Sequence, residues 1–456
     1  MEETSIERIK QIREAQRTYF HSGATLDVKT RKENLKLFEK AVLKWEKPLC
    51  DALWKDLHKS YEEAYLTEVS ILLGELRTHI RKINRWAKPQ CKFTPLKLFP
   101  SSSKIISEPL GTALIISPWN YPVQLLLTPL VGAISSGCTA VLKPSPYVPT
   151  VSKVIEDMIH ETFPEEYVAV VQGHRDVNTA LLEQRWDMIF FTGSPVLGRT
   201  VMTAAAKYLT PVVLELGGKS PCIIDKDADI KIAARRVAWG KALNAGQTCI
   251  APDYLMLHED IKDEFLAALK EEFTSLLGED PQKSRHFVRI VSDKAFDRLT
   301  GYLDNGKVLF GGHTDKSDRY FEPTVLDGVS PDSPIMQEEI FGPIFPVQTF
   351  RNLDEVIEFV TSREKPLALY YFGKDGDKVL KHTSSGGACI NDTIMHIANE
   401  KVPFGGVGNS GIGSYHGKLS FDAFTHRRAV ITTPTWLDVP FRYMPYSTFK
   451  LVKKLL

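Results

Sequence analysis

Between residues 111 and 214, short apolar runs alternate with longer helix-like stretches, and this alternation constrains the fold more than any other feature. The apolar runs, each typical of a buried strand, are 111–116, 140–143, 168–171, 188–191 and 212–214. Strands that alternate with helices favour a parallel, doubly wound sheet with helices on both faces. Ligands of such sheets bind beyond the carboxyl ends of the strands. The sequence therefore predicts an α/β fold with a binding site at that edge.

The alternation resumes after Gly218 and predicts a second α/β unit. Its expected strands are 222–224, 254–257, 345–350 and 368–372, and its expected helices are 230–244, 260–277 and 353–362. Either Asp227 or Asp229 is placed to cap the first of these helices. Residues 278–330 show no clear pattern beyond a turn at Gly311 and Gly312. A chain of 456 residues is too long for one ordinary core, so at least two domains are expected.

The segments outside these units have a different character. Residues 1–88 show helical periodicity, whereas 89–107 contain three prolines and three consecutive serines and are expected to form an extended arm. The tail, 421–456, carries three prolines and is expected to wrap another surface. The last eight residues, 449–456, are basic and amphipathic but too short to span a membrane, so a solvated end is expected, with weak binding to a membrane surface as the alternative.

Composition excludes several classes of function. Lys and Arg number 57 against 56 Asp and Glu, a net charge of +1, which gives no electrostatic case for a nucleic-acid partner. No apolar run reaches the roughly 18 residues of a membrane span, and the polar, acidic start is not a signal peptide. Six scattered cysteines without a CxxC pair suit reduced thiols and a cytoplasmic location. We predict no metal site.

Two turns that contain glycine carry residues suited to catalysis. Cys249 ends the turn 244–249, between a helical run and a strand-like run. A free cysteine is usually a small buried apolar residue, but a thiol at the end of such a turn is a candidate nucleophile. Glu215 follows an expected strand and precedes two glycines; the alternative is a strand-end carboxylate that faces water. Its apolar neighbours would raise its pKa and make it a candidate general base.

Seven short motifs resemble those of the aldehyde dehydrogenase superfamily. They are PWNYP (118–122), KPS (143–145), FTGS (191–194), ELGGK (215–219), GQTC (246–249), EEIFGP (338–343) and PFGG (403–406). The short N-terminus and the run 415–421 resemble the class 3 branch, which includes fatty and aromatic aldehyde dehydrogenases. The resemblance implies a Rossmann-like NAD(P)-binding domain (1–88 and 108–215), a catalytic domain (216–420), and an oligomerisation arm with a C-terminal tail (89–107 and 421–456).

The resemblance also implies NAD(P)-dependent oxidation of medium- to long-chain aliphatic or aromatic aldehydes to carboxylic acids. The thiolate of Cys249 would attack the carbonyl to give a thiohemiacetal, and hydride would leave to the nicotinamide. Glu215 would then activate the water that hydrolyses the thioester. The side-chain amide of Asn120 and the backbone N–H of Cys249 would hold the oxyanion, whereas the simpler interpretation of Asn120 is a turn residue.

Cofactor residues follow from the same motifs. The implied set is Trp119, Lys143, Gly193, Ser194, Gly198, Glu339 and Phe341. Lys143 would bond the adenine-side ribose and Glu339 the nicotinamide ribose, with Phe341 packed near the nicotinamide; otherwise these are a solvated lysine, a surface carboxylate and a core aromatic. The spacing of Gly193 and Gly198 is not GxGxxG, so this motif alone is weak.

The position three residues after Lys143 bears on the choice of cofactor. In many NAD-preferring members a glutamate there repels a 2′-phosphate, but this chain has Pro146, which carries no charge. We therefore expect NADP to be used as well as NAD, unless another acidic side chain fills the same space. Tyr65, Tyr121 and Phe404 are expected to line the aldehyde tunnel, although core aromatics are the commoner case.

Other functions remain open at this stage. A semialdehyde-specific or CoA-acylating relative is a near alternative, although Glu215 argues against acylation of CoA, which needs no hydrolytic base. A non-catalytic member that serves as a binding or structural protein should lack Cys249 or Glu215. A homodimer is expected through the arm and the tail, because an isolated extended edge is usually paired or covered.

Overall fold

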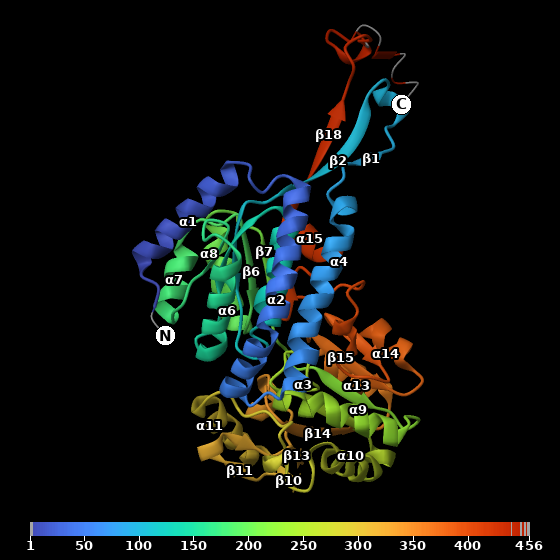
Figure 1. Cartoon of the computed structure of the whole chain (residues 1–456). Coiled ribbons are helices and arrows are strands. Elements are labelled where there is room, and N and C mark those ends of the chain that lie inside the picture. Colours follow the sequence, from blue (N-terminus) through green and yellow to red (C-terminus); the bar gives the residue numbers. More distant parts are fainter. Residues whose placement is uncertain (1–2, 439, 447–448, 451–452, 454–456) are drawn as a thin grey trace.

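The computed structural model describes residues 3–438, 440–446, 449–450 and 453. It contains a six-stranded sheet, a seven-stranded sheet and a projecting three-stranded arm (Figure 1). Within these described residues, no helix is both long enough and apolar enough to cross a membrane. Most of the basic ending at 449–456 lies outside them.

The six-stranded sheet has the spatial order β17-β7-β6-β3-β4-β5. Its strands are β3 (Thr112–Ile116), β4 (Thr139–Lys143), β5 (Val168–Val170), β6 (Met188–Thr192), β7 (Val212–Glu215) and β17 (Gly411–Ile412). The first five are parallel, and β17 pairs with β7 in the antiparallel direction. This arrangement confirms the predicted doubly wound sheet.

Helices cover both faces of this sheet, and alternate residues of its strands point to opposite cores. In β3, Ala113 and Ile115 belong to one hydrophobic cluster, and Leu114 and Ile116 belong to another. The helices of the first face are α2 (Val28–Leu57), α4 (Ser70–Trp86), α5 (Gln124–Ser136) and α6 (Pro149–Thr162). Those of the second face are α1 (Ile6–His21), α7 (Arg175–Glu183) and α8 (Pro195–Ala206) (Figure 1).

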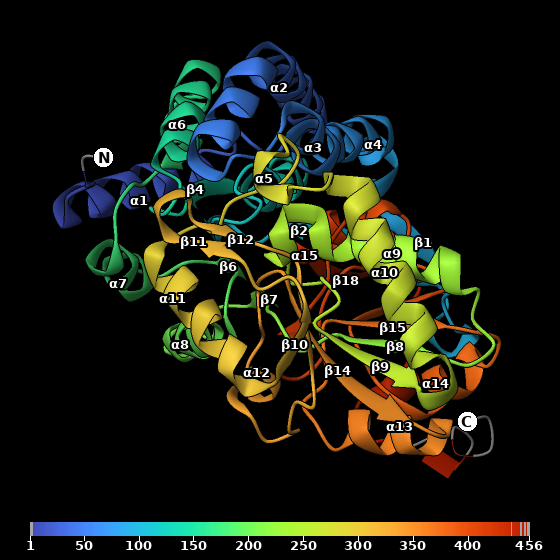
Figure 2. The same cartoon turned by 90° about the horizontal axis from the view of Figure 1, so that it is seen from below.

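The seven-stranded sheet has the order β10-β13-β14-β9-β8-β15-β16, and only the edge strand β10 is antiparallel to its neighbour among these described strands. The strands are β8 (Pro221–Ile224), β9 (Tyr254–His258), β10 (Lys307–Phe310), β13 (Thr324–Asp327), β14 (Ile344–Phe350), β15 (Ala368–Phe372) and β16 (Gly387–Ile390). Its helices are α9 (Ile230–Ala242) and α10 (Lys262–Leu277) on one face and α11 (Asp293–Tyr302), α13 (Leu353–Thr361) and α14 (Gly376–His382) on the other (Figure 2). The short helix α12 (Pro334–Gln337) and the hairpin β11 (Thr314–Asp315) and β12 (Tyr320–Phe321) complete this unit.

A helical segment between α2 and α5 contains an irregular turn. Helix α3 (Tyr61–Ala64) continues directly into a π-helical turn (Tyr65–Val69) and then into α4. Such π turns appear frequently at functional sites, because the wider turn changes the direction of the side chains that follow. This turn carries Thr67 and Glu68 toward the interior of the molecule.

The arm consists of β1 (Gln90–Lys92), β2 (Ser102–Pro109) and β18 (Thr425–Thr432), paired in the antiparallel order β1-β2-β18. It projects from one end of the body (Figure 1). Before it forms the last arm strand, β18, the chain returns to the six-stranded sheet, where β17 pairs with β7. Helix α15 (Lys418–Ala423) then packs near α5. The division into cofactor and catalytic domains at residue 215 stays a prediction.

Candidate active site

The turn that carries Cys249 has an unusual backbone. After α9 the chain forms a short helical turn, Leu243–Gly246, in which Asn244, Ala245 and Gly246 have φ angles of 52°, 50° and 69°. A left-handed conformation costs about 1–2 kcal/mol for a residue with a Cβ, so the first two need support from their surroundings. A side chain on Gly246 would overlap the backbone of Gly342.

Hydrogen bonds from Gln247 supply part of this support. Its side-chain Nε2 donates to the carbonyl oxygens of Asn244 and Arg289, each at 3.1 Å. Its Oε1 accepts from the backbone N–H of Val291 at 3.1 Å. The nucleophile loop, defined here as residues 244–249, is therefore closed on itself and fixed to the segment 289–291.

The turn after β3 brings Asn120 against the nucleophile loop. Its side-chain Nδ2 donates to the carbonyl oxygen of Gln247 at 3.0 Å, and the hydroxyl of Tyr121 lies 2.7 Å from that of Thr248. An amide nitrogen has two hydrogens, so one N–H of Asn120 is left for another acceptor. The side chain of Asn120 thus bonds the backbone two residues before Cys249, although Asn120 and Cys249 are 129 positions apart in the chain.

Cys249 and Glu215 line the same cavity. Tyr121 and Phe404 also line it, as predicted, and its walls are mostly apolar. Tyr65 is not among the described residues that line it; this ring stacks on Tyr61 at 6.3 Å between centroids. Its predicted contact with substrate therefore stays a prediction without geometric support.

Glu215 is buried at the end of β7, and neither carboxylate oxygen has a hydrogen-bond partner among the described residues. Burial alone raises the pKa of this carboxyl well above its ordinary value. A carboxyl without hydrogen-bond partners in an apolar cavity destabilises the fold, because it loses its hydration and gains no hydrogen bond in return. A buried carboxyl with a raised pKa in a cavity is instead typical of a residue that exchanges protons with a ligand or with water.

The thiol of Cys249 is half-buried, and its pKa is raised. Burial is the main cause, and the carboxylates of Glu339 and Glu215 add to it, whereas the backbone N–H groups of residues 249 and 250 oppose it. No cation is among the groups that oppose this shift, and the role of Cys249 as the attacking thiolate stays a prediction. Because a raised pKa disfavours the thiolate, a proton acceptor is needed when the thiol reacts.

A second, larger cavity of about 710 Å³ lies on the other side of the same strand ends. Ser194, Gly218 and Glu339 line it, whereas Thr192 and Glu215 line the cavity of Cys249. The segments 192–194 and 215–218 therefore run from one cavity to the other. Both segments lie at the carboxyl ends of β6 and β7, the edge of the sheet where the sequence predicts a ligand site.

Glu339 is held against the glycines that follow Glu215. A side chain on Gly217 would overlap its carboxylate, and its Oε1 has no described hydrogen-bond partner. Burial, together with the nearby carboxylate of Asp253, raises the pKa of Glu339 to about 8. The unpartnered Oε1 of this half-buried carboxyl can accept from hydroxyl groups of a ligand in the larger cavity.

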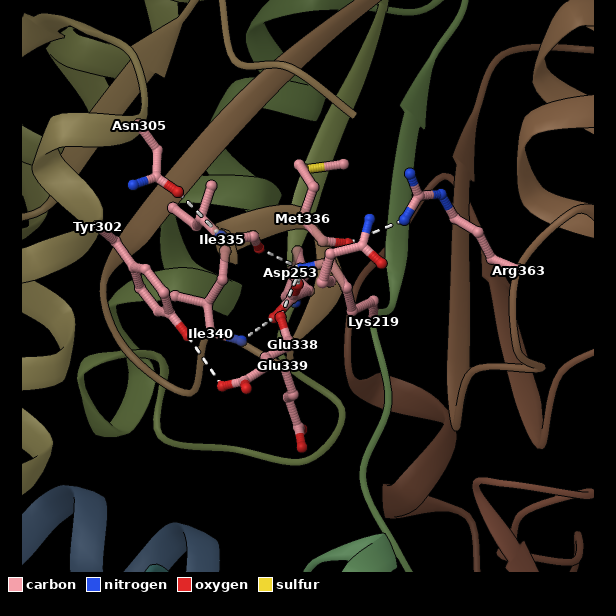
Figure 3. Close-up of polar contacts among 12 residues, drawn as sticks. Lys219, Asp253, Tyr302, Asn305, Ile335, Met336, Glu338, Glu339, Ile340 and Arg363 are labelled. Atoms are coloured by element: carbon pink, nitrogen blue, oxygen red, sulfur yellow. Dashed lines mark hydrogen bonds and ion pairs between the residues drawn. The ribbon is translucent and has the colours of Figure 1, made fainter. Parts of the chain in front are cut away.

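The segment around Glu339 is anchored by a polar network, shown in Figure 3. Lys219 forms an ion pair with Asp253 and donates to the carbonyl oxygens of Ile335 and Glu338 at 2.8 and 2.9 Å. Asp253 in turn accepts from the backbone N–H of Ile340 at 2.9 Å. The motif at 338–343 is thus held rigidly at the wall of the larger cavity.

The remaining predicted cofactor residues lie in two groups. Trp119 and Phe341 meet edge to face with centroids 5.4 Å apart. Ser194 caps α8, where its hydroxyl accepts from Leu197 N–H at 3.4 Å, and Gly193 N–H donates to the carbonyl of Glu215 at 3.0 Å. A neighbouring cavity of about 320 Å³, lined by Gly198, shares three lining residues with the larger one, Pro195, Glu364 and Asn409.

Lys143 lies apart from these cavities, at the end of β4. Its ammonium is buried and donates to the carbonyl oxygen of Pro144 at 2.8 Å. Burial lowers its pKa to about 8, and the carboxylate of Glu3 opposes this effect. The position is compatible with a ligand group at the adenine end of a dinucleotide, where an ammonium with spare N–H groups binds hydroxyls or phosphate.

Several lining residues of the Cys249 cavity escaped the sequence analysis. They are Thr67, Ile71, Gln124, Thr192, Ile394 and Tyr415. Thr67 and Ile71 are four residues apart, the spacing of one helix face, but ordinary core residues show the same spacing. Only the assembled fold reveals which of them face this cavity.

Comparison with known proteins identifies what this arrangement resembles. The profile of the aldehyde dehydrogenase family matches residues 1–430. The 4,4′-diaponeurosporen-aldehyde dehydrogenase of Staphylococcus aureus is 46% identical over 443 residues, covering 96% of both chains. The rat dimeric NADP-preferring aldehyde dehydrogenase is 44% identical over 93% of both chains.

Solved structures agree with these relatives. A substrate-bound structure of Staphylococcus aureus AldH superposes with a TM-score of 0.96 at 45% identity, and the match covers 98% of this chain and 99% of that one. A complex of Staphylococcus aureus betaine aldehyde dehydrogenase with NAD⁺ has a TM-score of 0.87 at 26% identity, over 97% of this chain and 90% of that one.

Proposed function

Because the chain belongs to the aldehyde dehydrogenase family, we propose that Cys249, Asn120 and Glu215 carry out its reaction at the cavity that they share or border. The protein is an NAD(P)-dependent aldehyde dehydrogenase that oxidises aldehydes to carboxylic acids. The observation that supports the residue roles is the orphaned Glu215 carboxyl in the cavity of the Cys249 thiol.

The first step is addition of the Cys249 sulfur to the aldehyde carbon. The thiol proton passes to a carboxylate acceptor, for which Glu215 is placed, and the carbonyl oxygen becomes the oxyanion of a thiohemiacetal. The free N–H of the Asn120 amide and the backbone N–H of Cys249 donate to this oxygen. One such donor is worth about 3 kcal/mol in the transition state.

The second step is oxidation and hydrolysis. Bound NAD⁺ or NADP⁺ supplies the hydride acceptor that converts the thiohemiacetal to a thioester. Glu215, once its proton has left to solvent, takes a proton from water, which adds to the thioester carbon and releases the acid and the Cys249 thiol. Its raised pKa makes the ionised carboxyl a stronger base than an exposed glutamate.

The larger cavity fits the cofactor. Its residues include Glu339, whose buried Oε1 has no described hydrogen-bond partner and is suited to ribose hydroxyls, and the capped N-terminus of the 12-residue helix α8 at Ser194, suited to phosphate. Trp119 and Phe341 would contact the nicotinamide end, and Lys143 the adenosine ribose. Of the predicted cofactor residues, Ser194 and Glu339 line the larger cavity and Gly198 lines the neighbouring one, which supports these assignments.

The substrate is a medium- to long-chain aliphatic or an aromatic aldehyde. The mostly apolar walls of the Cys249 cavity, including Tyr121 and Phe404, favour such a chain over a charged semialdehyde. The name of the staphylococcal relative, a 4,4′-diaponeurosporen-aldehyde dehydrogenase, is consistent with this preference.

A screen of NAD(P)H formation over hexanal, dodecanal, benzaldehyde and succinic semialdehyde tests the substrate class. Turnover confined to the semialdehyde would contradict it. In parallel, Cys249→Ser should bind cofactor normally but lose turnover, because an alcohol is a far weaker nucleophile than a thiol. Substantial kcat in this variant would reject the nucleophile assignment.

We also place the enzyme in the cytoplasm as a homodimer. All six cysteines are described and unpaired, which suits a reducing compartment. The arm exposes large apolar side chains, among them Phe93, Leu96 and Trp436, at 89%, 84% and 72%. An exposed apolar surface of this kind is usually covered by a partner, and the name of the rat relative describes a dimer.

A further inference from the structure

A buried ion pair lies directly behind the turn that carries Asn120, and the reaction described above does not use it. The charged groups of Lys59 and Glu68 are 2.6 Å apart, and both side chains are fully buried. A buried ion pair is weak evidence of stabilisation, because desolvation of the two charges offsets much of their attraction. Its role is better judged from the other contacts of the two side chains.

Both charged groups bond the backbone of this turn. The ammonium of Lys59 donates to the carbonyl oxygen of Asn120 at 3.0 Å and lies 4.2 Å above the ring of Tyr121. The second oxygen of Glu68 accepts from the backbone N–H of Val123 at 2.8 Å. The ion pair therefore holds the turn at both of its ends, and Glu68 reaches it from the π-helical turn.

The same contacts extend to the nucleophile loop. The carbonyl oxygen of Asn120 accepts a second bond from the Asn244 side chain at 3.0 Å. That side chain also donates to the Gln247 carbonyl at 2.9 Å, the group to which the Asn120 amide itself donates. Glu63 accepts from the backbone N–H of Asn244 at 2.9 Å. The segment 59–68 thus bonds both loops that meet at Cys249.

We propose that Lys59 and Glu68, with Glu63 as a second support, are positioning residues for the oxyanion site. They touch neither substrate nor cofactor; they hold the Asn120 amide and the Cys249 backbone N–H in the one relative geometry that lets both donate to the same oxygen. This proposal rests on the proposed function, in which Asn120 is an oxyanion donor. Such donors act only when their support keeps them in place.

The test uses the double variant Lys59→Met/Glu68→Gln, which removes both charges together and leaves no unpaired buried charge. Gln can still accept from Val123, and Met fills the space of the lysine chain, but the bond to the Asn120 carbonyl is lost. We expect kcat to fall roughly 100-fold, as for a small misplacement of catalytic groups. The Kd of NAD⁺, measured by quenching of protein fluorescence, should not change.

A double-mutant cycle separates positioning from a general structural effect. In the background of Asn120→Ala, the same double substitution should lower kcat by less than about threefold, because the group that it positions is already gone. An equal loss in both backgrounds would overturn the proposal, as would wild-type kcat in the double variant. The matched control, Lys47→Met/Asp51→Asn, removes an exposed ion pair on α2 and should leave kcat unchanged.

Two single variants, Glu63→Ala and Asn120→Ala, test the proposal independently of the double variant. If thermal melting shows that the double variant does not fold, Glu63→Ala on the second support decides instead: a kcat loss of roughly tenfold that disappears in the Asn120→Ala background supports the proposal, and no loss overturns it. Full activity of Asn120→Ala alone would also overturn it, while Cys249→Ser would still test the proposed function separately.

Discussion

Replacement of Glu215 by Gln should stabilise the protein, and the gain should grow with pH. The carboxyl is buried with both oxygens unpartnered, and its pKa is raised by burial alone. Glutamine has nearly the same shape but no charge and no proton to lose. The variant therefore removes the free-energy cost of a buried ionisable carboxyl and does not create a cavity.

The sign and size follow from proton linkage. In the unfolded chain the carboxyl ionises near its ordinary value of 4.5, whereas in the fold it keeps its proton to higher pH. The unfolded state then binds fewer protons, so the free energy of unfolding of the wild type falls as pH rises. The fall approaches about 1.4 kcal/mol per pH unit over the range in which the unfolded carboxyl is ionised and the folded one is still protonated.

Urea unfolding of both proteins at several pH values from 4 to 8 measures this difference. The two curves should nearly coincide at pH 4 and separate progressively above pH 5, with the variant more stable. The same substitution at the exposed Glu166 is the matched control and should give no such separation. A difference that is constant across this range would refute the account of Glu215 as a desolvated acid.

Three other results are expected. NAD and NADP should both be used, Pro146→Glu should shift the kcat/KM ratio toward NAD, and a wild-type preference for NAD beyond about a thousandfold, ~4 kcal/mol, would contradict the prediction. Sedimentation should show a dimer at micromolar concentration that dissociates in Phe93→Asp/Leu96→Asp; a monomeric wild type would refute the arm as an interface. Tyr121→Phe removes the 2.7 Å bond to Thr248 and should lower kcat/KM roughly fivefold, about 1 kcal/mol, and an unchanged value would show that this bond does not position the loop.

The sequence was most informative where local pattern and tertiary fold agree. The strand at 368–372 and the helix at 195–206 have the bounds that periodicity and Pro195 indicate. Gly137 ends α5 with a φ of 97°, and Asp229 rather than Asp227 caps α9 through a bond to Ile232 N–H. In each case the signal comes from residues adjacent in the chain.

Features that depend on distant contacts were not predictable in the same way. Residues 278–330 showed no clear pattern, yet they contain α11, β10 and β13; β10 carries a bulge opposite β13, which breaks the period of a strand. The left-handed Ala245 has no local signal, because alanine seldom adopts that conformation without tertiary support. The sequence also contains no signal that residues 411–412 form a strand that pairs with β7.

The same distinction holds for the candidate active site: its residues were predictable from local motifs, whereas their electrostatics and support were not. Motifs pointed to Cys249, Glu215 and Asn120, and the structure brings the loops of all three together. The raised pKa of the Cys249 thiol and the support from Lys59 and Glu68 depend on burial and on contacts across 55 or more positions of the chain. Sequence spacing carries no information on either property.

Rapid acid quenching of Glu215→Gln mixed with aldehyde and NAD⁺, followed by mass spectrometry of its peptides, tests the central claim most directly. If Cys249 carries the acyl group and Glu215 is needed to remove it, one equivalent of NADH should form in a burst, and the peptide with Cys249 should gain the mass of the acyl group. An adduct on any of the other five cysteines, or steady turnover at the wild-type rate with no adduct, would contradict the account.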